Sequence, residues 1–346
     1  MSSFFSTSTD FFGLDIGTTA VRLVQLHNNG GQQSLIKYAY VPVPAKLGMS
    51  DSKTDQKKLA DIVKQLVSQA NVSTKDVAVG IPSSRVFTTV ADVDRLPTNE
   101  LAKAIKFQAD SLIPTPLNES KIDWSLLGDS PIDKTKQEII LSSVTNKFVE
   151  ERLDMLEAIG LNVVAFEPDN LAMARALTSG DNVAQLVLDV GSRSTDLVIV
   201  YNSKPYLTRN IPTGVEAIER SAAQNLSVAD KQAHEFVFKF GLSTEKLEGQ
   251  VYQAISATVD LLIVEIEKSI KFFQTRYKGV NIQRIIVTGG ASVIPEFPLY
   301  LANKFGIEVE IGNAWRNVVF NQDRQNELGS ISNQFGVAVG LAERKS

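Results

Sequence analysis

The strongest constraint on this chain is a short block near its start that recurs about half a chain later. Leu14-Asp15-Ile16-Gly17-Thr18-Thr19 is followed, 174 residues further on, by Leu188-Asp189-Val190-Gly191-Ser192. The two openings align without a gap into the next segment, where Leu23 is repeated as Leu197. Because the chain has 346 residues, this offset is close to half its length, and the sequence predicts an internal duplication.

Hydrophobic periodicity predicts the same order of elements at the start of each half. In the first half we expect three antiparallel strands, a helix and a strand, at 14–16, 20–27, 34–41, 59–70 and 76–81. In the second half we expect three strands, a helix, a long helix and a strand, at 183–189, 196–201, 206–211, 213–226, about 250–277 and 283–288. The fold class is therefore predicted to be α/β, with two related halves.

The segment between the halves does not fit the repeat. It shows a helix at 99–112, a proline-rich stop at 113–116, a strand at 138–144 and a helix at 147–159. We therefore expect a first half over 1–84 and 166–182, an inserted subdomain over 85–165, and a second half over 183–346 with a helical subdomain at about 213–282.

Composition excludes several classes of protein. The net charge is −4, so no basic bias indicates nucleic acid, and the chain has no cysteine for disulfides or thiolate metal sites. No stretch approaches the ~20 apolar residues of a spanning helix. Met1 to Asp10 lacks the pattern of a signal peptide, and the last six residues lack an amphipathic anchor. We therefore expect a cytoplasmic protein without direct membrane insertion.

The repeated Asp-x-Gly-Thr block can serve phosphate chemistry. A glycine lets the backbone approach a phosphate closely, and backbone N–H groups with the Thr18 and Thr19 hydroxyls can donate to its oxygens. Asp15 would be a hard oxygen ligand for Mg²⁺, through water. A single copy is more often a hairpin turn capped by Asp and Thr. Two copies favour a metal-nucleotide held between two facing carboxylates, Asp15 and Asp189.

Two further segments each have two interpretations. Arg22 follows the first block on the outgoing strand, where it is either a cation for phosphates or an ordinary surface arginine. Thr288-Gly289-Gly290-Ala291-Ser292 follows a strand, and is either a place for a nucleoside against the backbone or a plain strand-to-helix turn.

Five blocks in order resemble the actin, Hsp70 and sugar-kinase superfamily. They are two phosphate loops (14–26 and 188–200), a connecting segment (166–172), an adenosine loop (285–292) and a closing helix (335–341). The resemblance implies an actin-like fold with two ribonuclease H-like halves and a nucleotide cleft between them. Gly13-Leu14-Asp15-Ile16-Gly17, the segment 100–116 with Ile122-Asp123-Trp124, and the helix 265–273 look most like the PilM family of type IV pilus assembly proteins, with FtsA as a relative.

The resemblance also implies roles for named residues toward ATP and Mg²⁺. Asp15, Gly17, Thr18, Thr19 and Arg22 would hold phosphates from one side, and Asp189, Gly191, Ser192, Arg193 and Ser194 from the other. Gly289, Gly290, Glu265 and Lys268 would contact the adenosine, with Gly214 and Glu216 toward the ribose. Glu167 lies where related ATPases position the attacking water, and both aspartates would hold Mg²⁺.

Two residues depart from the family pattern. The family usually has lysine where Arg22 stands, and Arg193 is bulky for a phosphate loop. Both departures favour ATP binding with weak or absent hydrolysis.

By resemblance, the inserted subdomain would bind the N-terminal cytoplasmic peptide of an inner-membrane PilN-like protein. This partner would keep the chain at the inner face of the cytoplasmic membrane, and PilB/PilT-type motor ATPases would be further partners. The leading hypothesis is thus a nucleotide-dependent scaffold. The alternative is an FtsA-like cell-division protein or a cytomotive filament ATPase. The core of the insert itself explains Phe107, Leu112 and Ile113 at least as well as a partner groove does.

Overall fold

A computed structural model describes residues 10–48 and 50–344 of the chain. Its contacts form two compact units. The first comprises Met1–Pro82, Lys147–Ala176 and Asn313–Ser346, and the second comprises Ser83–Asn146 and Leu177–Gly312. The units thus group the inserted segment with the second half and the last 34 residues (313–346) with the first, whereas the predicted domains follow the repeat and stay a prediction. The expectation for the N-terminal leader lies, except for Asp10, outside the described residues.

The first unit is built on a six-stranded sheet in the order β14-β3-β2-β1-β4-β8. Its strands are β1 (Phe12–Ile16), β2 (Ala20–Asn29), β3 (Gln32–Pro42), β4 (Asp76–Ile81), β8 (Asn162–Pro168) and β14 (Val318–Val319). The first three form the predicted antiparallel meander, and β4 and β8 lie parallel to β1. The predicted return of the chain from the insert to the sheet of the first half is confirmed by β8.

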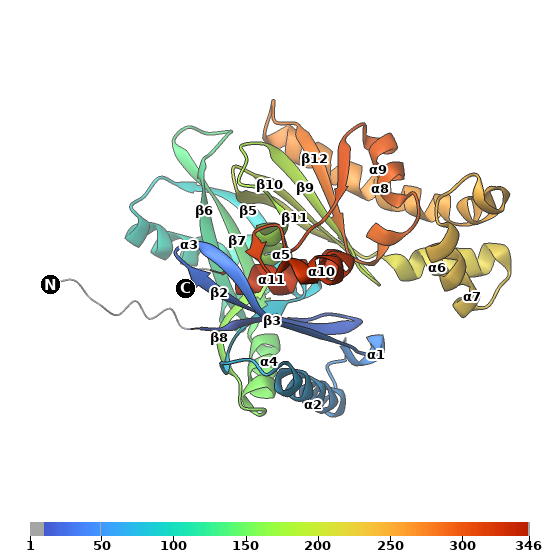
Figure 1. Cartoon of the computed structure of the whole chain (residues 1–346). Helices are drawn as coiled ribbons and strands as arrows, with labels where there is room; N and C mark the ends of the chain where they lie inside the picture. Colours follow the sequence, from blue (N-terminus) through green and yellow to red (C-terminus); the bar gives the residue numbers. More distant parts are fainter. Residues whose placement is uncertain (1–9, 49, 345–346) are drawn as a thin grey trace. The chain divides into compact units, whose positions relative to one another are not determined.

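Helices cover both faces of this sheet (Figure 1). They are α1 (Ala45–Gly48), α2 (Lys53–Ala70), α4 (Asn146–Glu157), α5 (Asp169–Leu177), α10 (Gln325–Ile331) and α11 (Gly336–Ala342). The predicted apolar face of α2 packs with α4 on one side, where Leu59 and Leu156 are fully buried beside Leu14. On the other side α11 lies directly against β1, because a Cβ on Gly13 would overlap the helix backbone.

The second unit contains a five-stranded sheet in the order β11-β10-β9-β12-β13. Its elements are β9 (Ala184–Val190), β10 (Thr195–Tyr201), β11 (Lys204–Ile211), β12 (Ile282–Thr288), β13 (Glu308–Ile311), α6 (Val215–Leu226), α7 (Asp230–Phe240), α8 (Gln250–Arg276) and α9 (Phe297–Phe305). The strands and the two helices predicted here are confirmed. The repeat is also confirmed at the level of pairing, because β9 and β10 pair as β1 and β2 do.

The inserted segment forms a three-stranded antiparallel sheet, β5-β7-β6, with one helix packed on it. Its elements are β5 (Val86–Asp94), α3 (Thr98–Leu112), β6 (Ser120–Asp129) and β7 (Lys136–Thr145). The sequence predicted α3 and β7 but not β5 or β6. Ile113 is buried in the core of the insert, as the simpler interpretation holds, whereas Phe107 is 87% exposed.

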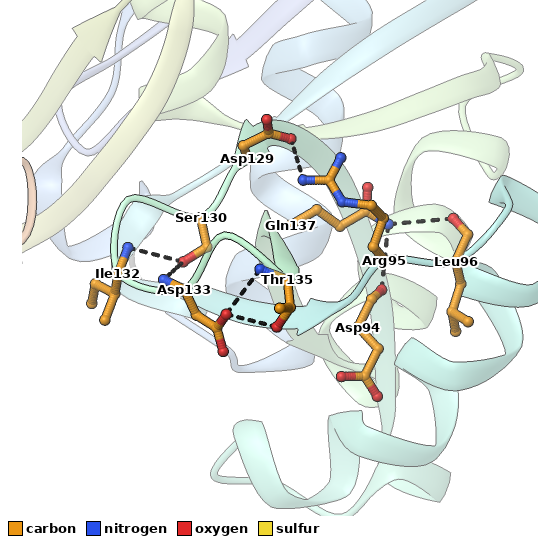
Figure 2. Close-up of polar contacts among 9 residues, drawn as sticks. All are labelled: Asp94, Arg95, Leu96, Asp129, Ser130, Ile132, Asp133, Thr135 and Gln137. Carbon is orange, nitrogen blue, oxygen red and sulfur yellow. Dashed lines mark hydrogen bonds and ion pairs between the residues drawn. The ribbon is translucent and has the colours of Figure 1, made fainter.

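The β6–β7 turn is closed by its own side chains (Figure 2). The Ser130 hydroxyl oxygen accepts from the N–H groups of Ile132 and Asp133, at 3.2 and 3.1 Å. Arg95, just after β5, forms an ion pair of 2.7 Å with Asp129 at the end of β6. These contacts fix the length of the hairpin and tie both outer strands of the sheet together at this end.

A buried ionic network joins the insert to α8 within the second unit. Glu138 of β7 is 1% exposed and accepts from Arg276 at 2.6 Å and from the Tyr277 hydroxyl at 2.8 Å. Arg276 also donates to Asp92 of β5 at 2.8 Å. Burial raises the pKa of Glu138, against the opposing effect of these two donors. The insert is therefore fixed to α8 by a charge that has partners only while the two remain together.

Over the described ranges 10–48 and 50–344, no helix combines the length and the apolar character that crossing a membrane would require.

Candidate functional site

The first of the two repeated loops is a tight turn between β1 and β2. The Gly17 N–H donates to the Ala20 carbonyl at 3.0 Å, and the Val43 N–H donates to the Thr19 carbonyl at 2.9 Å. Gly48 packs on the back of the turn, where an added Cβ would lie 2.8 Å from the Thr18 carbonyl oxygen and 2.9 Å from that of Gly17. The predicted residues Gly17, Thr18 and Thr19 therefore sit in a backbone held from two neighbouring segments.

Asp15 and Arg22 face each other across β1 and β2 at the base of this loop. Arg22 Nη1 lies 3.3 Å from Asp15 Oδ2, and both side chains are largely buried. Burial raises the pKa of Asp15, and the Arg22 guanidinium opposes this rise. In this structure Arg22 is thus the partner of Asp15, and it is not the surface arginine of the alternative interpretation.

The carboxyl ends of β1, β4 and β8 bring Glu167 level with Asp15. Strand pairing places Gly80 beside Glu167 and, one residue past the Leu14–Val79 pair, beside Asp15. Gly80 leaves the space that the Asp169 carboxylate fills, because an added Cβ there would overlap Asp169 Oδ1. The sequence did not single out Asp169 as a site residue.

Two arginines engage the Glu167 carboxylate. Arg175 of α5 forms an ion pair with Oε1 and also donates to the Gly340 carbonyl. Arg344 lies 3.6 Å from Oε2. A carboxylate that accepts from two guanidinium groups is a poor acceptor for the proton of an attacking water.

The second loop, between β9 and β10, is fixed by the N-terminus of α6. The carbonyls of Gly191 and Ser192 accept from the N–H groups of Val215 and Glu216, at 2.9 and 2.8 Å. Gly214 makes this approach possible, since an added Cβ would lie 2.5 Å from the Gly191 carbonyl oxygen and 2.6 Å from that of Ser192. In a trans peptide the C=O and N–H point in opposite directions, so the N–H groups of Ser192 and Arg193 point away from α6.

Side chains of the second loop are tied to α6 as well. The Ser192 hydroxyl donates to Glu216 Oε1 at 2.8 Å, and Arg193 Nε lies 3.2 Å from Glu216 Oε2. Ser194 closes the turn, because its carbonyl accepts from the Gly191 N–H at 3.0 Å.

The glycines after β12 lie against Asp189. Gly289 has φ of +78°, and an added Cβ would overlap the Asp189 carboxylate and approach the Val190 carbonyl oxygen at 2.7 Å. Gly290 would meet the Val215 side chain at 3.4 Å. The second unit therefore brings Asp189, the loop 191–194, Gly214, Glu216 and the pair Gly289–Gly290 together.

Asp196 is a carboxylate of this site that the sequence reasoning missed. It lies directly opposite Asp189 on the paired strand and accepts from Asn210 at 2.7 Å. Burial raises its pKa, against the opposing effect of that hydrogen bond. The repeat could have revealed Asp196, because it stands 174 residues after Arg22.

Glu265 and Lys268 are not brought to this group. Glu265 pairs with Lys268 at 2.5 Å and with Arg209 of β11 at 3.2 Å. Strands β10 and β9 separate β11 from β12, which is roughly 14 Å at about 4.8 Å per strand. Their predicted contact with adenosine stays a prediction.

A sequence model described as type IV pilus assembly protein PilM matches residues 13–346. The chain belongs to the PilM family. A solved PilM-PilN type IV pilus biogenesis complex matches with a TM-score of 0.83 at 24% identity, over 96% of this chain and 98% of that one. The PilM fold is thus shared over the whole match.

More distant structures show the same actin-like fold. The ethanolamine utilization protein EutJ of Carboxydothermus hydrogenoformans matches with a TM-score of 0.57 at 16% identity, over 96% of this chain and 89% of that one. MreB5 of Spiroplasma citri bound to ADP matches with a TM-score of 0.54 at 15% identity, over 96% and 95%. The predicted fold class and family are confirmed.

Proposed function

We propose that this PilM-family chain is an ATP-binding scaffold of type IV pilus assembly, in which both repeated loops bind the phosphates of Mg²⁺-ATP. The single observation that carries the proposal is the second loop, where two N–H groups point away from α6 beside Asp189 and Gly289. MreB5, which shares the fold, has been solved with ADP and with AMPPNP.

The residues present fit such a ligand. The Ser192 and Arg193 N–H groups suit phosphate oxygens, and Asp15 and Asp189 offer the hard oxygen ligands that Mg²⁺ takes, through water. Gly289 and Gly290 present backbone without side chains, which leaves room for a nucleoside. When bound, the metal would neutralise phosphate charge, and this chain's carboxylates would orient its water shell.

Hydrolysis is expected to be slow. Glu167, the candidate for positioning water, already accepts from Arg175 and lies within ion-pair distance of Arg344. ATP would then act as a conformational ligand, which shifts an equilibrium by binding one state better than another.

Calorimetry tests the proposal. ATP with Mg²⁺ should bind, and Asp15→Ala and Asp189→Ala should each weaken binding about 100-fold or more, because each removes a metal-orienting carboxylate. Asp61→Ala on the outer face of α2 is the matched control, since it removes the same charge at an exposed position. Unchanged affinity in both loop variants would refute the site, and turnover within the ~1–10³ s⁻¹ of ordinary enzymes would favour a filament ATPase instead.

We further propose that the insert binds the N-terminal cytoplasmic peptide of a PilN-like inner-membrane protein, which would hold the chain at the inner face of the membrane. A groove of about 420 Å³ lies between α3 and β6, with Ile105, Lys106 and Trp124 among its lining residues. Phe107 stands exposed on α3 next to Lys106. An exposed aromatic side chain beside a groove suits an extended apolar peptide.

Two exposed phenylalanines allow a matched test of the peptide site. Phe107→Ala should weaken binding of a fluorescent synthetic peptide about tenfold, because truncating an aromatic contact typically costs more than 1 kcal/mol. Phe272→Ala on α8, where the side chain is 65% exposed, is the control and should leave binding unchanged. Equal effects of the two variants in fluorescence anisotropy would exclude this face of the insert as the peptide site.

A further inference from the structure

Glu216 stands at the start of α6 and holds two side chains of the second loop. Its carboxylate accepts from the Ser192 hydroxyl at 2.8 Å and lies 3.2 Å from Arg193 Nε. Both are groups that would serve a nucleotide phosphate. Glu216 thus occupies, toward Ser192 and Arg193, the chemical role of an anion.

We propose that Glu216 is an internal competitor for the phosphate, so that a nucleotide must displace its carboxylate from Ser192 and Arg193 before those groups can bind. This inference rests on the proposed function, and it assigns Glu216 to regulation of the site rather than to the ribose contact that resemblance implies.

Chemistry decides which anion wins. A terminal phosphate carries about −1.5 to −2 charges and three acceptor oxygens, whereas a carboxylate carries one charge and two oxygens. The side chains of Arg193 and Glu216 are 46% and 33% exposed, so water screens their ion pair and a stronger anion can replace it. Glu216 therefore lowers nucleotide affinity without abolishing it.

The backbone keeps the loop in place when the side chains exchange partners. The Gly191 and Ser192 carbonyls stay bonded to the first N–H groups of α6, and those bonds do not involve the Glu216 carboxylate. Removing the charge of Glu216 should therefore free Ser192 and Arg193 without unfolding the loop.

Calorimetry with the full chain tests the proposal, with Mg²⁺-ATP and adenosine as the two probes. Glu216→Gln should bind ATP about 3- to 10-fold more tightly, which is the range expected for losing a partly exposed charge-assisted contact, and should bind adenosine as the wild type does. Glu219→Gln, one turn further along α6, removes the same charge from an ion pair with His234 and should change neither. Thermal unfolding of both variants checks that the helix is intact.

A double variant gives the second measurement. In Arg193→Ala, the further change Glu216→Gln should have at most a threefold effect on ATP affinity, because the competing pair no longer exists. Weaker binding of ATP and adenosine alike in Glu216→Gln would support a ribose contact and overturn the proposal, as would unchanged ATP affinity. If the wild type binds no ATP at all, the proposed function fails; if it binds and Glu216→Gln is no tighter, only this inference fails.

Discussion

The two repeated loops share a backbone plan but differ in the charge that faces their aspartate. In the first unit Asp15 lies opposite Arg22, and the two form a buried ion pair. In the second unit Asp189 lies opposite Asp196, so two carboxylates occupy the corresponding positions. The first loop thus neutralises its own aspartate, while the second gathers negative charge that a cation would relieve.

The helical contacts behind the loops differ too. Gly48, at the end of α1, packs behind the first loop, whereas Gly214 and the N-terminus of α6 hold the second loop by direct hydrogen bonds. A duplicated fold can therefore keep its geometry while each copy takes a separate electrostatic role. We expect the first loop to depend on its ion pair and the second on its backbone.

The largest expected effect separates the two aspartates by stability. Asp15→Ala leaves the guanidinium of Arg22 largely buried without its carboxylate, so the free energy of unfolding should fall by about 3 kcal/mol. Asp189→Ala removes one of two facing carboxylates and should change it by less than about 1 kcal/mol. Urea denaturation at pH 7 measures both, and equal losses would break the comparison.

A methyl group behind each loop should show which one depends on its backbone. Gly214→Ala forces a Cβ against two carbonyls that accept from α6, so we expect a loss of about 2 kcal/mol in stability and of about tenfold in ATP affinity. Gly48→Ala meets carbonyls at 2.8 and 2.9 Å and should cost about 1 kcal/mol. A larger loss of ATP affinity in Gly48→Ala would reverse the assignment.

The first unit also holds a carboxyl whose ionisation is unfavourable. Burial raises the pKa of Glu343 to about 7 from 4.5, with Arg175 opposing the rise. The native state keeps this proton longer than the unfolded state, so stability is lost as pH rises from 4.5 to about 7. Glu343→Gln should match the wild type near pH 4 and be about 2 kcal/mol more stable at pH 8, in urea titrations. A constant difference between pH 4 and pH 8 would contradict this origin.

The smallest effect should come from Asp196 in the second unit. Burial raises its pKa above 3.8, so its charge costs stability once the pH exceeds the native pKa. Asp196→Asn should therefore stabilise the chain by about 1 kcal/mol at pH 7 and have no effect at pH 3. Arg22→Ala at the matching position should destabilise instead, and stabilisation by both changes would show that the loops do not differ in charge.

The sequence predicted the sheets because the repeat and the hydrophobic alternation are both local in the chain. The meander of β1 to β3, helix α2 and the strands β9 to β12 all follow from such patterns. Strands β5 and β6 escaped prediction because their burial comes from α3 and β7, and edge strands carry weaker alternation.

The site was predictable only in part for a similar reason. The repeat identified Asp15 and Asp189, but the residues that decide their environment lie on other elements. Arg344 is 177 positions from Glu167, and no spacing in the chain links them. Asp196 was available from the repeat, since a residue at the same offset as the aspartates should be compared with Arg22.

The network around Glu138 bears on how this protein can be divided for experiments. A fragment of residues 83–146 would carry Glu138 into water without Arg276 and Tyr277, and the remaining chain would keep an arginine cut off from both of its acids. Neither piece is then a faithful reagent for partner binding. A chimera that exchanges the insert between relatives should carry the end of α8 with it, so that the transplanted graft brings its own counter-charge.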